Sequence, residues 1–104
     1  MAGPRDFTVE QAVAYFAEKY GADVRLALCI VRHESGFNPA ARNPGSSAGG
    51  VWQFIDGTFV STARRMGRDW RLPDKYDMMV NAEAGAWLLA HDGYKHWIVW
   101  PKCL

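Results

Sequence analysis

DVRLALCIVRHESG (residues 23–36) is a mostly apolar stretch with a helix signal at each end. Asp23 can accept hydrogen bonds from the first helical turn, and Gly36 can end the helix in the left-handed conformation. Residues 24–32 are apolar except for Arg25 and Arg32, so they leave little polar surface. The stretch therefore predicts a helix whose pattern ends at residues 33–36. We expect it to be the central and most buried helix of the fold.

Three further helices are predicted, each from a capping residue and a glycine that ends the pattern. They run from the capping box at Thr8 to Gly21, from a Thr58 cap through Met66 to Gly67, and from an Asp77 cap to Asp92 with Gly93 beyond it. Asn-Pro and Gly-Gly pairs mark residues 36–50 as a long loop, and residues 68–76 form a second loop. Residues 51–55 can be a short strand or an extended segment. The sequence thus predicts a mainly α fold of about four helices, with long loops and at most a short β element.

The size and charge of the chain exclude several classes of protein. Its 104 residues, 49% of them hydrophobic, suffice for a single domain with one core. Twelve Lys and Arg against eleven Asp and Glu leave a net charge of +1, which disfavours nucleic acid as the main partner. No apolar run exceeds six residues, whereas a membrane span needs about 20. The start, MAGPRD (1–6), has neither the basic stretch nor the apolar core of a secretion signal. A chain that acts outside the cytoplasm would leave by another route or be a domain of a longer protein.

Glu34 is the residue whose surroundings best suit acid chemistry. It lies at the predicted end of the helix, where the macrodipole is negative, and Ile30 and Val31 lie one turn back. Both the negative potential and desolvation disfavour the carboxylate and raise its pKa, as a general acid near neutral pH requires. The alternative is a solvated acidic residue at a frayed helix end.

The loop after Glu34 combines neutral polar side chains with aromatic ones. Asn43, Ser46, Ser47 and Gln53 can hydrogen-bond a neutral polar ligand, and Trp52 and Phe54 offer apolar faces. Sugars present hydroxyl and acetamide groups together with apolar C–H faces, so the mixture suits a sugar. The alternative is that Asn, Ser, Gly and Pro are simply the usual residues of loops.

Other chemistry finds little support in the sequence. The three histidines have no metal-ligand spacing, no serine lies in a G-x-S-x-G elbow, and the Gly45–Gly50 segment lacks the lysine of a phosphate-binding loop. We therefore expect no metal and no organic cofactor. Trp97 and Trp100 are expected in the core or in a lid. Cys29 and Cys103 can form a disulfide or remain buried thiols, and the residues alone leave both open.

Two motifs resemble a known family. CIVRHESGFNP (29–39), followed by SAGGVWQF (47–54), resembles the soluble lytic transglycosylase-like and resuscitation-promoting-factor-like branch of the lysozyme superfamily. The resemblance continues through residues 77–89, with Asn81 and the Ala-Gly-Ala step, and through WIVWPKC (97–103). It covers roughly residues 8–103. A small lysozyme-like fold is therefore implied for the single domain 1–104, with long loops that line a cleft.

The resemblance also implies roles for particular residues. Glu34 matches the family's single catalytic acid and base, and Ser35 matches a neighbour that helps to fix the acid and the substrate. Gly50 and Gln53 match the motif that lines the cleft. Cys29 and Cys103 resemble a disulfide pair of small secreted members, which implies an oxidising location. The chain departs from the family at Trp52, where a smaller side chain is usual, and it lacks the Tyr-Asn-Ala-Gly motif, for which Tyr94 is the nearest candidate.

The expected activity is cleavage of the β-1,4 bond between N-acetylmuramic acid and N-acetylglucosamine in peptidoglycan. As a lytic transglycosylase the enzyme would leave 1,6-anhydro ends, with Glu34 as acid and then base. The alternatives are a hydrolytic muramidase of the same fold and a non-catalytic peptidoglycan-binding module of a phage tail or wall assembly. Asp56 is interpreted as part of a turn or helix cap rather than as a second catalytic acid. We expect a monomer that acts on glycan strands outside the cytoplasm, in the cell wall, in secreted form or on a phage virion.

Overall fold

Four α-helices and three short 3-10 helices make up the fold in the computed structural model, which describes residues 6–104. The elements are α1 (Val9–Tyr20), α2 (Val24–Ser35), α3 (Asp56–Arg65), η2 (Leu72–Tyr76), α4 (Met78–Asp92), η3 (Gly93–His96) and η4 (Trp100–Cys103). Among these residues β structure is limited to two isolated bridges, which join Gly49 to Arg42 and to Phe54. The prediction of a mainly α fold is therefore confirmed. None of the described helices combines the length and the apolar content needed to cross a bilayer.

The ends of α1, α2 and α4 follow the capping residues in the sequence. The Thr8 hydroxyl accepts a hydrogen bond from the Gln11 N–H, and the Gln11 side chain accepts one from the Thr8 N–H, which completes the capping box. The Asp23 carboxylate caps α2 by accepting from the Leu26 N–H, and the Asp77 carboxylate caps α4 by accepting from the Met79 and Val80 N–H groups. At the other end of α2, Gly36 adopts the left-handed conformation with φ of 60°. These three predicted helices are confirmed.

The start of α3 differs from the prediction. The helix begins at Asp56, two residues before the expected Thr58 cap, and Ile55 at the N-cap position makes no side-chain hydrogen bond. The Ser47 hydroxyl, nine residues earlier, accepts a hydrogen bond from the Asp56 N–H at 2.9 Å. Because this cap comes from the long loop rather than from the adjacent residues, the local pattern could not reveal it.

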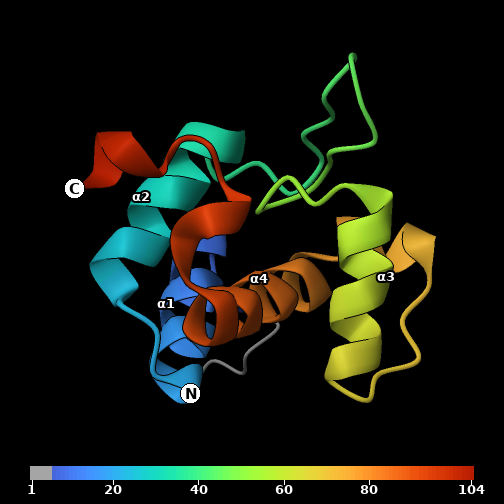
Figure 1. Cartoon of the computed structure of the whole chain (residues 1–104), viewed down its shortest axis with the longest axis horizontal. Coiled ribbons are helices and arrows are strands. Elements are labelled where there is room, and N and C mark those ends of the chain that lie inside the picture. Colours follow the sequence, from blue (N-terminus) through green and yellow to red (C-terminus); the bar gives the residue numbers. More distant parts are fainter. Residues whose placement is uncertain (1–5) are drawn as a thin grey trace.

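The most buried helix is α4, not α2 as predicted. Buried residues follow one another through α4 from Asn81 to Ala86, whereas α2 buries Ala27, Ile30 and Val31. The centre of α4 consists largely of alanine and glycine, so neighbouring segments can approach it closely on several sides. Figure 1 shows α4 running between α1 and α3, and both of these helices pack against it.

The loop before α3 is anchored in the core by Trp52. Its side chain is fully buried, with the ring of Trp97 at a centroid distance of 4.9 Å. The Trp97 indole N–H donates to the Trp52 carbonyl oxygen at 3.0 Å. On α4, a Cβ added at Gly85 would lie 2.2 Å from the Trp52 ring, so glycine is needed there to admit the indole. Trp97 thus lies in the core.

Gly85→Ala is expected to destabilise the protein by about 2–3 kcal/mol, because the added methyl group must displace a fully buried ring. Gly57→Ala is the matched control. Gly57 lies in α3, where an added Cβ meets nothing within 4 Å, so alanine there should be neutral or slightly stabilising. Urea unfolding followed by tryptophan fluorescence measures both variants. Equal stability of the two would contradict the packing argument.

The C-terminal tail returns to α2. Cys29 in α2 and Cys103 in η4 form a disulfide with a Cα–Cα distance of 5.7 Å. Figure 1 shows the tail leaving the end of α4 and finishing beside α2. The disulfide implied by the resemblance is therefore present, and it fixes the tail to the helix that carries Glu34.

Candidate active site

Glu34 is the penultimate residue of α2, and its side chain is half-buried. Burial raises the pKa of its carboxyl above the ordinary value, in the direction expected from the sequence. Arg32 and His33, the preceding residues, are exposed. A half-buried carboxyl with a raised pKa can hold a proton closer to neutral pH and deliver it to a bound ligand.

Glu34→Gln is expected to raise the stability of the protein at neutral pH. Because the folded-state pKa of Glu34 is raised, its stabilising contribution is complete below the unfolded-state pKa and is lost as the pH rises through the folded-state pKa. The glutamine amide does not ionise and avoids this loss. Thermal unfolding at a series of pH values should give melting temperatures that converge in acid and separate towards neutral pH. A difference that is independent of pH would contradict this assignment.

Ser35 ties the end of α2 to the following loop. Its hydroxyl lies 2.7 Å from the Val51 carbonyl oxygen, to which it donates, and 3.3 Å from the Val31 carbonyl oxygen in its own helix. Val51 is fully buried. The bond fixes the residue next to Glu34 against the segment that leads to Gln53, so the two predicted polar residues belong to one connected piece of structure.

Asn81, which is fully buried on α4, holds this segment from the other side. Its Oδ1 accepts from the Trp52 N–H at 2.8 Å, and its Nδ2 donates to the Lys75 carbonyl oxygen at 2.8 Å. Gly50 lies against it with φ of 81°, and a Cβ there would be 2.2 Å from Asn81 Nδ2. Both the backbone conformation and the lack of space thus require glycine at position 50. The turn that contains Gly50 and Gln53, the cleft motif implied by the resemblance, is therefore rigid.

Gln53 adopts a left-handed backbone conformation, with φ of 56°. Its Nε2 donates to the carbonyl oxygens of Gly50 at 2.9 Å and Ala41 at 3.1 Å. These bonds leave the side-chain oxygen, Oε1, without a partner among residues 6–104 and able to accept from a ligand. A cavity of about 100 Å³ adjoins the turn and is lined by Gln53, Phe54, Ile55, Thr58, His96 and Trp97.

The structure gives the remaining predicted residues surroundings that differ from those of Gln53. Trp52 is fully buried, so its indole presents no face to a ligand, and the expectation of a direct sugar contact is corrected to a packing role. Tyr94 is partly exposed and stacks on Trp100 at a centroid distance of 4.3 Å. Asn43 lies in a second, larger cavity that neither Gln53 nor Phe54 lines.

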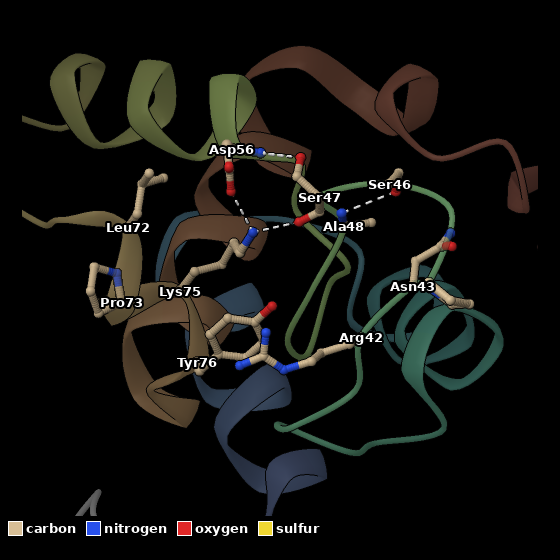
Figure 2. A pocket seen from close by; sticks show the side chains of 11 residues that line it. Arg42, Asn43, Ser46, Ser47, Ala48, Asp56, Leu72, Pro73, Lys75 and Tyr76 are labelled. Atoms are coloured by element: carbon tan, nitrogen blue, oxygen red, sulfur yellow. Dashed lines mark hydrogen bonds and ion pairs between the residues drawn. The ribbon is translucent and has the colours of Figure 1, made fainter.

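The larger cavity has a volume of about 730 Å³ and lies between the 42–48 loop and η2 (Figure 2). Asp56 is on its wall, and its Oδ1 accepts from the ammonium group of Lys75 at 2.7 Å. Because this carboxylate is paired with a lysine, it does not provide a free second acid beside Glu34. The sequence reasoning missed Lys75, which is almost fully buried, since an isolated lysine in a loop gives no signal of burial.

Two other clusters of reactive side chains are occupied by internal contacts. Glu83 on α4 accepts hydrogen bonds from the Tyr20 hydroxyl and from Arg68, and burial together with Glu83 raises the pKa of Tyr20 to about 12. The sulfur atoms of Cys29 and Cys103 lie within 4.8 Å of a His33 ring nitrogen. Since the two sulfurs are joined as a disulfide, they carry no thiolate for a metal.

Comparison with known proteins points to one family. The sequence matches the family model of the transglycosylase SLT domain over residues 11–100, which is most of the chain. The matched range contains Glu34, the Ser35–Val51 bond and the turn that carries Gln53. No solved structure matches the chain.

Proposed function

We propose, from the premise that this chain belongs to the transglycosylase SLT domain family, that it cleaves the β-1,4 bond between N-acetylmuramic acid and N-acetylglucosamine as a lytic transglycosylase. Family membership supports lytic transglycosylase-type activity on peptidoglycan in general. The finer assignment has Glu34 as the single acid and base. One observation carries it: the half-buried Glu34 carboxyl has a raised pKa and is followed by a serine bound to the cleft-motif segment.

In the first step, protonated Glu34 donates its proton to the glycosidic oxygen, and the bond from that oxygen to C1 of N-acetylmuramic acid breaks. The acetamide of the same sugar stabilises the positive charge at C1, so a second carboxylate is dispensable. The pairing of Asp56 with Lys75 agrees with such a mechanism. Gln53 Oε1 would accept a hydrogen bond from the sugar and orient it.

In the second step, the Glu34 carboxylate takes the proton from the C6 hydroxyl of the same sugar. The oxygen of that hydroxyl attacks C1 and closes the 1,6-anhydro ring. Glu34 is then protonated again and ready for the next cycle. A general acid with a raised pKa suits both steps, since it must give up a proton and recover it near neutral pH.

The proposed substrate lies outside the cytoplasmic membrane, so the chain would act in an extracytoplasmic space. The Cys29–Cys103 disulfide supports this location, because such bonds persist in oxidising compartments.

Mass spectrometry of the fragments released from purified peptidoglycan tests the chemistry. We expect muropeptides lighter by one water than the hydrolysis products, which is the mark of 1,6-anhydro ends. Reducing ends instead would replace the proposal by a hydrolytic muramidase, in which water takes the place of the C6 hydroxyl. Binding to peptidoglycan without any release of fragments would identify a non-catalytic module.

A further inference from the structure

The cavity between the 42–48 loop and η2 plays no part in the proposed bond cleavage. Neither Glu34 nor Gln53 lines it. At about 730 Å³ it is within the range of sites that hold small organic ligands and is much larger than a single ion needs. Gln53 nevertheless contacts the segment that forms one wall of the cavity, because its Nε2 donates to the carbonyl oxygen of Ala41, the residue before Arg42, at 3.1 Å.

The wall of this cavity carries an excess of positive charge. Two cations, Arg42 and Lys75, face one carboxylate, Asp56. The Lys75 ammonium group pairs with Asp56 and also donates to the Ser47 carbonyl oxygen, so the lysine is internally satisfied. Arg42 keeps the remaining charge, since no carboxylate in residues 6–104 forms an ion pair with it.

The Arg42 guanidinium group is oriented by stacking. It lies over the ring of Tyr76, with 4.3 Å between its central carbon and the ring centroid. In Figure 2 the guanidinium group of Arg42 overlies the Tyr76 ring, among the residues that line the cavity. Stacking leaves the N–H groups at the rim of the guanidinium plane free to donate to two oxygens at once, the geometry that a carboxylate accepts.

The rest of the lining suits a peptide that carries this carboxylate. Asn43 uses Oδ1 to accept from the Gly45 N–H, and its amide N–H groups have no partner among residues 6–104, so they can donate to a ligand carbonyl. Leu72 is 43% exposed at the rim, next to Pro73, and both can contact an alkyl side chain. A carboxylate, backbone carbonyls and small alkyl groups occur together in a short peptide.

We propose that this cavity binds the carboxylate-bearing stem peptide of peptidoglycan, with Arg42 pairing its carboxylate and Asn43 and Leu72 contacting its backbone and side chains. The identity of the polymer rests on the proposed function. The glycan strands carry such peptides on N-acetylmuramic acid, so a peptide held here would help to position the strand that crosses the candidate active site.

Peptide binding gives the direct test. Isothermal titration with L-Ala-γ-D-Glu-L-Lys-D-Ala should show binding that weakens roughly ten-fold in Arg42→Gln, as expected for the loss of one charge-assisted pair. Arg64→Gln removes the same charge at the far end of α3 and should bind like the wild type. Equal binding by all three proteins, or unchanged binding of the fully amidated peptide, would overturn the proposal. So would tighter binding of a glycerol-phosphate oligomer, which would assign the cavity to a phosphate polymer.

Cleavage kinetics separate this proposal from the proposed function. We expect the wild type to have a lower KM for peptide-bearing strands than for strands stripped of their peptides by an amidase, and Arg42→Gln to lose most of that difference. If the wild type binds the peptide in an Arg42-dependent way but cleaves neither substrate, the cavity assignment stands and the enzymatic one fails. If it cleaves both with the same KM, the cavity assignment fails and the enzymatic one stands.

Discussion

Glu34→Gln is expected to reduce the release of fragments from peptidoglycan by about 10³-fold or more. Glutamine keeps the shape of the side chain, but it can neither donate the proton to the glycosidic oxygen nor remove one from the C6 hydroxyl. Because one group serves both steps in the proposed mechanism, its loss leaves no partner to take over either of them. Asp56 is held by Lys75 and lies on the wall of the other cavity.

The measurement is the initial rate of soluble muropeptide release, with thermal unfolding recorded on the same samples. Glu18→Gln is a suitable control, because Glu18 is an exposed glutamate on α1, remote in sequence from the cleft motif. The control should keep the wild-type rate, and Glu34→Gln should remain folded at neutral pH. A Glu34→Gln protein that still releases fragments within ten-fold of the wild-type rate would exclude Glu34 as the acid.

The helices could be predicted where their signals are local. Thr8, Asp23 and Asp77 cap the helices that follow them, and Gly36 ends the helix that carries Glu34. The start of α3 could not be predicted in this way, because its first N–H is bound by Ser47 from the long loop. A hydrogen bond between segments that meet only after folding leaves no periodic pattern in the sequence.

The relative burial of α2 and α4 shows a second limit. The apolar pattern of α2 suggested that it would be central, but several of its apolar side chains remain partly exposed. In contrast, α4 is central because small residues such as Gly85 let neighbours come close, among them the ring of Trp52. Hydrophobicity predicts which face is buried, whereas the closeness of approach depends on the shape of the partner.

The candidate site was predicted in part. Glu34 could be found from its position at a helix end and from its apolar neighbours one turn back, and burial does raise its pKa. Asn81 entered through a resemblance alone, although it supplies the bonds that hold the cleft-motif turn. Arg42 and Lys75 gave no signal at all, because each acquires its role from residues about 20 to 35 positions away in the sequence.

The Cys29–Cys103 disulfide is expected to make a large contribution to stability. It joins residues 74 positions apart, so in the unfolded chain it removes the freedom of a loop that spans most of the sequence. For a loop of this size the chain-entropy model gives about 4 kcal/mol. Cys29→Ala/Cys103→Ala should therefore unfold roughly 15–30 °C below the wild type.

Reduction separates the covalent link from the side chains. Wild type in excess dithiothreitol should melt close to the double variant, and the reductant should not change the melting temperature of the double variant. Below that temperature we expect the double variant to keep most of its cleavage rate, because Ser35 still fixes the end of α2 through Val51 and Asn81 still holds the turn. Loss of cleavage in a protein that remains folded would mean that the tail, and not only these two hydrogen-bonded anchors, positions Glu34.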